Sequence, residues 1–472
     1  MPITPNEFCQ WKGEVDAPNR KPVISKVSLE RYLTQQGFYC CYDDSNQSDI
    51  HMVRVIDRRI YNCGTNIMYN YLVNVLEKEH SQWLDALKDY IVLLFKPTII
   101  QMKRLEPKML RDTDTTSYIP FNNGVVTVTR TGVELKSYSE LLTGNTYILN
   151  SKIIPRNIDL QFANYESGVW NRFLTNAVGE KGLPYLKRAL GYMLHTHKDK
   201  SNAKIVFLSD STSGNHSRAM GGSGKSLISY SALNELRNVF YEDGKSFNPK
   251  STFKFQGLSI DNDICCIDDV VKEFNQKVIY NLTTGNFSSE EKYKARKIID
   301  FQDSCKFIIN GNYGISLDDD SDIRRTCIIG LTDYYNARNT PMMEFKHRFF
   351  SEWTGDRAIE YQYFYATMFS CIQMYLQSGM ESYKYEQVAK KGTVNKYPDT
   401  LIKSINTVKH NFIGIANAMT QEDIKERIGN YTTDCIKALK SIMESDGYDW
   451  LKDRKRVIGK VNPADLYYFK KK

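Results

Sequence analysis

Short apolar runs alternate with segments of helical spacing in the middle of this chain. An apolar run at 204–208 precedes a glycine-rich loop and a second apolar stretch at 227–233, and later runs end in acids at 263–269 and in amides at 306–312. Runs of this length predict buried strands, and their alternation with helical segments is typical of a parallel sheet covered by helices. The pattern therefore predicts an α/β core over 204–336.

The flanking segments have different patterns. Short alternations such as that at 51–56 mix with helix-like runs at 66–79 and 81–94, which indicates a small N-terminal α+β domain. Near the C-terminus, a helical segment at 432–445 and two strand-like segments at 455–460 and 465–469, on either side of Asn462-Pro463, favour a small winged-helix-like domain. The expected divisions are 1–112 (α+β domain), 113–203 (strand-rich connector and helical region), 204–336 (α/β core), 337–395 (helical extension of the core) and 396–472 (C-terminal domain).

The glycine-rich loop that contains Lys225, the lysine loop, has the clearest candidate chemistry. A loop between a buried strand and a helix turns successive backbone N–H groups toward a phosphate. We expect Lys225, on an exposed loop, to reach the β- and γ-phosphates of a nucleoside triphosphate, and the Ser226 hydroxyl to bind Mg²⁺. Ala219 stands where this motif usually has glycine, and polar residues at 209–220 lengthen the loop. A glycine-rich turn that only caps a helix is the alternative. The expected nucleotide-binding residues are Gly221, Gly222, Ser223, Gly224, Lys225, Ser226 and Leu227.

Two later strands end in polar side chains suited to triphosphate hydrolysis. Asp268 is expected to hold the metal and Asp269 to orient the attacking water. Asn312 is the expected sensor of the γ-phosphate or water, and Asn310 is the second choice. Acidic strand ends and Asn-Gly turns are also common without any function. Their position after the lysine loop favours catalysis.

Paired arginines precede a further apolar run. Arginine supplied across a subunit boundary can stabilise the charge that develops during phosphoryl transfer, and Arg324 or Arg325 is the candidate. An isolated arginine pair is more often a solvated surface feature. The order of loop, acid pair, amide and arginine pair favours the catalytic interpretation.

This order of motifs resembles that of the superfamily 3 helicases, most closely the helicase part of phage, plasmid and poxvirus-type primase-helicases. The resemblance covers about residues 113–335 and includes a segment in which Thr284-Gly285 precedes a basic stretch. In that family the corresponding segment is a basic hairpin facing the central channel of a ring. The residues expected to contact the DNA backbone are Lys292, Lys294, Arg296 and Lys297. A solvated helix face, paired with Glu290 and Glu291, is the alternative for this stretch.

The resemblance implies a P-loop, AAA+-like ATPase core that uses ATP and Mg²⁺. It also implies a homo-oligomeric ring, expected to be a hexamer, whose protomers hold ATP at their boundaries, with helices of 113–203 helping to hold the ring together. The implied partner is single-stranded or forked DNA, and a separate primase or initiator is a further candidate partner because no cluster of carboxylates for priming is evident. Lysine and arginine contacts to phosphates are indifferent to base sequence, as an unwinding motor requires.

Composition agrees with a polyanionic partner without requiring one. The chain has 472 residues and a net charge of +8, and its ten cysteines include no C-x-x-C pair, which predicts reduced, buried thiols. A zinc site from Cys40, Cys41, His51 and Cys63 fits no standard spacing. The longest apolar run, at 90–95, is too short to cross a bilayer, so we expect no membrane partner and a location in the cytoplasm of a bacterial host cell.

The leading hypothesis is an ATP-driven, ring-forming replicative DNA helicase of a phage, plasmid or other mobile element. The alternative is a P-loop ATPase that acts as a nucleotide-dependent initiator, remodeller or defence switch without unwinding DNA. That alternative explains the nucleotide motifs but not the basic stretch. A small-molecule kinase is disfavoured because it requires neither a ring nor this order of motifs.

Overall fold

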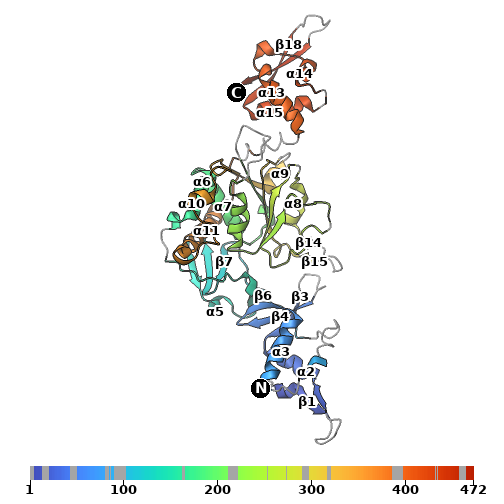
Figure 1. The fold of residues 1–472 in the computed structure, drawn as a ribbon, viewed down its shortest axis with the longest axis vertical. Coiled ribbons are helices and arrows are strands. Elements are labelled where there is room, and N and C mark those ends of the chain that lie inside the picture. Colours follow the sequence, from blue (N-terminus) through green and yellow to red (C-terminus); the bar gives the residue numbers. More distant parts are fainter. Residues whose placement is uncertain are drawn as a thin grey trace.

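In the computed structural model, shown as a ribbon in Figure 1, the described residues form six sheets, one of which is a five-stranded parallel sheet. The residues that the structure describes are 5–12, 21–42, 50–79, 84–85, 87–89, 102–161, 165–210, 222–251, 253–272, 274–289, 297–315, 320–384, 388, 397–430, 432, 434–455 and 464–471. Among these residues, no helix combines the length and the hydropathy that a transmembrane span requires.

The N-terminal part is built on a mixed sheet with the strand order β3-β4-β5-β10-β6. Helices pack on one face of it, where Leu29, Phe38 and Leu72 are buried in a common cluster. The predicted helix at 66–79 and the predicted strand at 51–56 are confirmed, whereas most of the predicted helix at 81–94 lies outside the described residues. The elements are α1 (Pro5–Phe8), β1 (Cys9–Lys12), β2 (Lys21–Ile24), α2 (Lys26–Gln35), β3 (Phe38–Tyr42), β4 (Ile50–Ile56), β5 (Arg59–Cys63), α3 (Thr65–Glu79), β6 (Lys108–Met109) and β10 (Thr146–Leu149).

Strand β10 joins this sheet from a distant part of the sequence. It pairs in parallel with β5 on one side and with β6 on the other. The sheet therefore draws strands both from the range 1–112 and from the range 113–203.

The ten cysteines are all free and buried, which confirms the predicted burial of these side chains. The zinc site considered from the sequence does not assemble. Cys41 lies opposite His51 across β3 and β4, whereas Cys40 lies opposite Met52, which in turn lies opposite Cys63. Because successive strand residues point to opposite faces, the four candidate ligands are divided between the two faces of the sheet.

An antiparallel meander and a helical layer come next. Gly191 on α7 lies against the backbone of Cys371 on α11, and a Cβ at this glycine would come within 2.0 Å of the Cys371 carbonyl oxygen. The two helices can pack this closely only because the residue has no side chain. The elements are β7 (Thr116–Phe121), β8 (Gly124–Thr129), β9 (Val133–Lys136), α5 (Tyr138–Leu141), α6 (Val169–Val178), α7 (Leu183–Leu194) and α11 (Ile359–Ser378), with short 3-10 turns η3 (Asn150–Lys152), η4 (Tyr165–Ser167), η5 (Lys200–Asn202) and η7 (Gly355–Ala358).

The parallel sheet has the strand order β12-β13-β16-β11-β17. Its central strands are buried on both faces: Val206 and Leu208 of β11 pack with the helices α6, α7 and α11, whereas Ile205 and Phe207 pack with α8 on the other face. This arrangement confirms the predicted α/β class with a helix-covered parallel sheet. The elements are β11 (Ile205–Asp210), the π-helical turn η6 (Leu227–Ala232), β12 (Val239–Asp243), β13 (Ile264–Val270), α8 (Lys277–Thr284), β14 (Phe287–Ser289), β15 (Lys297–Ile299), β16 (Lys306–Gly311), α9 (Asp320–Arg325), β17 (Thr326–Leu331) and α10 (Pro341–Phe345).

The C-terminal part has a hydrophobic cluster of its own, formed by three helices and a hairpin. The hairpin places Trp450 against Tyr467, with ring centroids 5.0 Å apart. The predicted strand at 465–469 is confirmed as part of β19, whereas the predicted strand at 455–460 lies, except for Lys455, outside the described residues. The elements are α13 (Asp399–Val408), η8 (Lys409–Phe412), η9 (Ile415–Asn417), α14 (Gln421–Ile428), α15 (Cys435–Ser445), β18 (Tyr448–Lys455) and β19 (Ala464–Lys471).

Candidate nucleotide-binding site

The glycine-rich loop lies at the carboxyl edge of the parallel sheet, between β11 and η6. Gly222 and Gly224 have φ angles of 90° and 83°, which L side chains rarely adopt. A Cβ at Gly224 would also lie 2.7 Å from the Phe173 ring on α6. The turn therefore requires glycine at both positions, and the packing against Phe173 also requires it at Gly224. Gly221, which we expected to bind nucleotide, lies outside the described residues.

Lys225 is buried rather than exposed, which corrects the sequence expectation. Its Nζ lies 2.9 Å from both carboxylate oxygens of Asp210, 2.9 Å from the Ser223 hydroxyl and 2.9 Å from Oδ1 of Asn312. The side chains of Lys225 and Asp210 are 8% and 3% exposed. The lysine is thus held by partners from β11, from the loop itself and from the end of β16.

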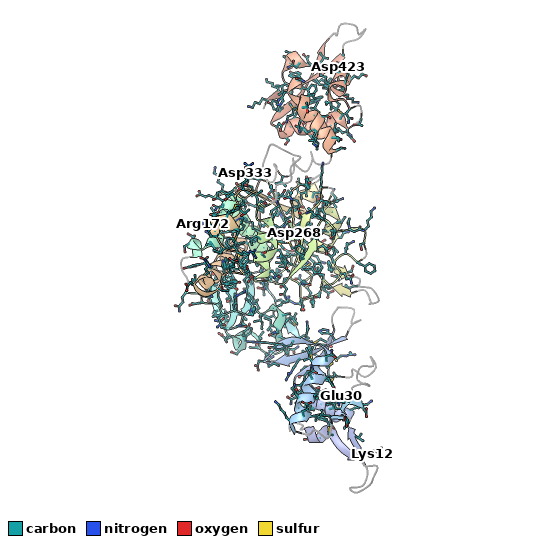
Figure 2. The ribbon with its side chains drawn as sticks, viewed as in Figure 1. Lys12, Glu30, Arg172, Asp268, Asp333 and Asp423 are labelled. Carbon is teal, nitrogen blue, oxygen red and sulfur yellow. The ribbon has the colours of Figure 1, made fainter. Side chains whose placement is uncertain are left out.

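Ser226 and Asp268 meet as a metal site would require. The Ser226 hydroxyl donates to Oδ1 of Asp268 over 3.0 Å, and the Tyr241 hydroxyl lies 3.3 Å from Oδ2 of the same carboxylate. Burial and the neighbouring Asp268 carboxylate raise the pKa of Tyr241 to about 12, so this hydroxyl stays a neutral donor. Figure 2 labels Asp268 within the part of the ribbon that the parallel sheet forms. Hydroxyl and carboxylate oxygens are the ligands that Mg²⁺ prefers, so these residues fit that ion.

A backbone irregularity lets Asp268 and Asp269 face different partners in one site. The register between β13 and β16 shifts between Ile267 and Val270, and Asp269 has a φ angle of 55°. A bulge of this kind re-aims side chains that would otherwise alternate between the faces of the sheet. Outliers of this kind persist where the surrounding structure holds them, often at functional sites.

The two asparagines at the end of β16 have different surroundings. Asn310 is 1% exposed; its Oδ1 accepts from the Asp269 backbone N–H over 2.9 Å, and its Nδ2 donates to the Ser229 hydroxyl. Asn312 is partly exposed and joins the charged groups: its Oδ1 accepts from Lys225 and its Nδ2 donates to Oδ1 of Asp269 over 3.0 Å. The first choice for the sensor therefore lies among the charged groups, and the second choice supports the backbone beneath them.

Lys245 completes the group of charges around Asp269. Its Nζ lies 2.5 Å from Oδ2 of Asp269, and its side chain is 67% exposed. The pKa of Lys245 is raised by its hydrogen bond and ion pair with Asp269. Neither this lysine nor Tyr241 was found from the sequence, because β12 has no strong alternation. Asp210 was also missed, although it ends an apolar run in the same way as Asp268.

The structure does not bring the paired arginines to the lysine loop of the same chain. Thr326, which follows Arg325, pairs with Ile205 at the start of β11, whereas the loop follows Asp210 at its other end. A parallel strand of this length spans roughly 16 Å. Arg324 is exposed, and the Arg325 guanidinium lies 5.5 Å from the centre of the Tyr280 ring on α8.

An antiparallel hairpin is present where the basic stretch was expected. β14 and β15 pair from Phe287 with Ile299 to Ser289 with Lys297. Phe287 and Ile299 are buried and hold the base of the hairpin in the core beneath the sheet. Lys292, Lys294 and Arg296 lie outside the described residues, and of the predicted set only Lys297 is placed, as the first residue of β15.

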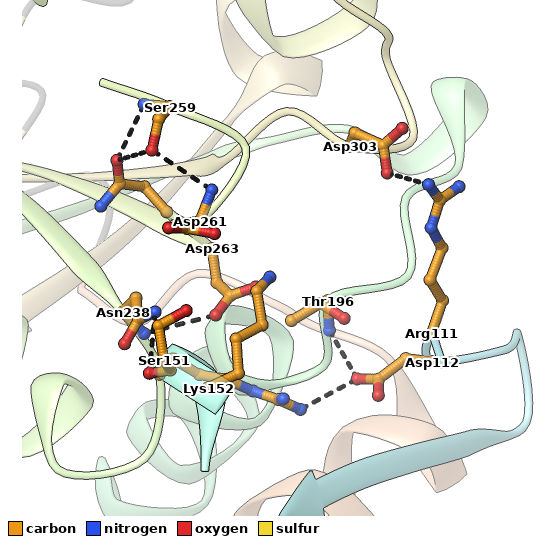
Figure 3. Close-up of polar contacts among 12 residues, drawn as sticks. Arg111, Asp112, Ser151, Lys152, Thr196, Asn238, Ser259, Asp261, Asp263 and Asp303 are labelled. Carbon is orange, nitrogen blue, oxygen red and sulfur yellow. Dashed lines mark hydrogen bonds and ion pairs between the residues drawn. The ribbon is translucent and has the colours of Figure 1, made fainter. Parts of the chain in front are cut away.

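A cavity of about 430 Å³ lies at the opposite edge of the parallel sheet, away from the lysine loop. It is lined by residues that precede β13 and β16 and by residues of the N-terminal sheet. Ion pairs join its walls: Lys152 lies 2.7 Å from Asp263, and Arg111 lies 2.5 Å from Asp303 (Figure 3).

Asp112, on the wall of this cavity, is a fully paired buried carboxylate. It accepts from Ser117, from the Tyr118 and Thr196 backbone N–H groups and from Arg237. Burial alone would raise its pKa, but the Arg237 guanidinium and these hydrogen bonds hold the pKa below its usual value. The group joins the segment after β6 and strand β7 to residues that follow α7 and η6.

Comparisons with known proteins give only distant likenesses. No family model matches the chain, and a search of curated proteins finds no match. Among solved structures, the chain is similar to the A form apo structure of the NrS-1 C-terminal region at 12% identity and a TM-score of 0.38, over 93% of this chain and 98% of that chain. It is similar to SCCmec type IV Cch, described as an active helicase, at 11% identity and a TM-score of 0.34, over 99% of this chain and 97% of that chain. Likenesses this distant carry no argument, so the functional conclusion depends on the geometry of the site.

Proposed function

We propose that this chain is an ATP-driven, ring-forming replicative DNA helicase of a phage, plasmid or other mobile element. Its core would be a P-loop, AAA+-like ATPase that uses Mg²⁺. The observation that supports this proposal is a pair of adjoining hydrogen-bonded sets, one formed by Lys225, Asn312 and Asp269 and the other by Ser226 and Asp268. These residues come from one loop and from the ends of two strands, β13 and β16, far apart in the sequence. Together they supply a phosphate-binding cation, ligands for a metal and groups that can orient water.

The roles follow from the contacts. The backbone N–H groups of the loop and Lys225 would bind the β- and γ-phosphates, while Ser226 and Asp268 would hold Mg²⁺, which neutralises charge on the phosphate oxygens. Asp269 would accept a hydrogen bond from the attacking water. Asn312, already bonded to both Lys225 and Asp269, would keep that water in line with the γ-phosphate.

The remaining parts of the proposal concern the ring and the DNA. Because Arg324 and Arg325 lie at the far end of the strands from their own loop, they would act on the nucleotide of a neighbouring protomer in a ring, expected to be a hexamer. The β14–β15 hairpin would contact single-stranded DNA through its lysines and arginine. The winged-helix-like C-terminal part and a separate primase or initiator would connect the ring to its replication origin.

Strand displacement on a forked duplex, measured together with ATP hydrolysis, tests this function. Lys225→Arg keeps a cation beside Asp210, so the fold should be retained while the geometry at the phosphates is lost and both activities fall. Lys181→Ala, on an exposed turn between α6 and α7, is the matched control and should change neither activity. Hydrolysis by Lys225→Arg at the unmutated rate would contradict the P-loop assignment. DNA-independent hydrolysis without strand displacement would instead favour the initiator, remodeller or switch.

A further inference from the structure

The ammonium group of Lys225 has no hydrogen atom left for a phosphate in the structure as it stands. A lysine ammonium carries three N–H donors. Nζ lies within 2.9 Å of acceptors on three residues, namely Asp210, Ser223 and Asn312. A phosphate oxygen can therefore bind this lysine only if one of the three residues gives up its contact.

The chemistry of the three partners indicates which contact is exchanged. Ser223 and Asn312 are neutral and can remain beside a phosphate as donors or acceptors. Asp210 is an anion, and its side chain is only 3% exposed, so water screens it poorly. A phosphate placed on Lys225 would lie within a few ångströms of this carboxylate, and the two negative charges would repel each other.

We propose that Asp210 acts as a resident anion that holds Lys225 in the nucleotide-free protein and competes with the triphosphate for it. This inference rests on the proposed nucleotide site and adds a residue that sets its affinity. The carboxylate keeps the buried lysine paired while the site is empty. When nucleotide binds, Lys225 exchanges the carboxylate for phosphate, so part of the binding free energy is used to break the resident pair.

Two effects of opposite sign distinguish this role from a purely structural one. Asp210→Asn removes the charge but keeps an oxygen that can accept from Lys225. It should lower the melting temperature of the free protein, because the buried ammonium loses its counter-charge. It should also tighten binding of Mg-ATP and of inorganic pyrophosphate about tenfold, because the repulsion is removed. A residue that only shapes the loop would, on mutation, weaken both the fold and the binding.

The experiment compares wild type, Asp210→Asn and Asp333→Asn by calorimetric titration with Mg-ATP and with pyrophosphate, alongside thermal unfolding of each free protein. Asp333, labelled in Figure 2, is exposed and lies two residues beyond Leu331, the partner of Asp210 in the sheet. Its substitution therefore removes the same charge from a nearby position on the sheet without removing a partner of Lys225. Tighter binding by Asp210→Asn alone, with a lower melting temperature, is the expected result.

Equal or weaker binding by Asp210→Asn, with wild type binding normally, would overturn the proposal while leaving the nucleotide site in place. An equal gain in Asp333→Asn would also overturn it, because the effect would then be one of general charge. Absence of binding in all three proteins would overturn the nucleotide site itself. If Asp210→Asn does not fold, Asp210→Ser, which also lacks the charge and retains an oxygen, takes its place in the same comparison.

Discussion

Changing each of the two asparagines at the end of β16 to alanine should have different effects: Asn310→Ala should lower stability, and Asn312→Ala should lower ATP hydrolysis. Asn310→Ala removes the acceptor of the Asp269 backbone N–H and the donor to the Ser229 hydroxyl, both in a site where Asn310 itself is 1% exposed. Water cannot replace these partners. Asn312→Ala removes contacts to Lys225 and Asp269, each of which keeps a charged partner, Asp210 and Lys245 respectively.

The magnitudes follow from these contacts. For Asn310→Ala, the lost bonds and an unsatisfied buried N–H should together cost about 2–4 kcal/mol of the free energy of unfolding. For Asn312→Ala, the cost should be at most about 1 kcal/mol, because the groups left behind are still paired. Its effect should instead fall on hydrolysis, with kcat lowered about 100-fold or more, as when one positioned donor is removed from a transition state.

Urea unfolding followed by tryptophan fluorescence, together with steady-state ATP hydrolysis, measures both quantities. Trp170 and Trp353 belong to the buried cluster in which Val206 and Leu208 of the parallel sheet pack against α6, α7 and α11. Their fluorescence emission therefore reports the unfolding of the core. The midpoint should fall for Asn310→Ala with an unchanged slope. A loss of stability in Asn312→Ala as large as that in Asn310→Ala would refute the distinction, as would a normally stable Asn310→Ala protein.

Three further predictions test the chemistry and the assembly. Asp269→Asn should bind ATP but fail to hydrolyse it, as shown by nucleotide titration and single-turnover assays; rapid hydrolysis would exclude Asp269 from water activation. The double variant Arg324→Ala, Arg325→Ala should be inactive alone but should regain part of its activity when mixed with Asp269→Asn. In the mixture, some subunit boundaries combine an intact lysine-loop site from one protomer with intact arginines from its neighbour. Absence of rescue in co-assembled mixtures would show that the arginines do not act on the nucleotide of a neighbouring protomer. Changing Lys294 and Lys297 to alanine should weaken binding of unrelated DNA sequences equally and flatten its salt dependence, measured by fluorescence anisotropy; an unchanged salt slope would exclude the hairpin as the DNA contact.

The strands that carry the site could be predicted because they are buried on both faces. β11, β13 and β16 contain uninterrupted apolar runs at 205–208, 264–267 and 307–309, and polar residues follow each run directly. Since the carboxyl ends of neighbouring parallel strands share an edge, the convergence of the lysine loop with the acid pair and the amide follows from the order of the strands. The sequence could therefore predict that these groups lie close together.

The contacts within the site could not be predicted, because they depend on tertiary placement. Lys225 is enclosed by Asp210, Ser223 and Asn312, the last of which is 87 positions away in the sequence. The left-handed backbone of Asp269 has no signal in its residue type, since most such positions hold glycine. Strand β10 joined a sheet from far along the chain through pairings of two residues on each side, too short to show any periodicity.

The net charge of the site indicates that ATP binding would need positive charge beyond that of Lys225 and Lys245. Asp210 pairs with Lys225 and Asp269 pairs with Lys245, while Asp268 accepts from Ser226, so these three carboxylates and two ammonium groups together carry one excess negative charge. A triphosphate brings several more, and like charges at short range in a poorly hydrated site repel strongly. Binding therefore requires added positive charge. In the proposed function Mg²⁺ supplies it beside Asp268, and an arginine from a neighbouring protomer supplies it at the γ-phosphate, so that the site would hydrolyse ATP only at a completed subunit boundary.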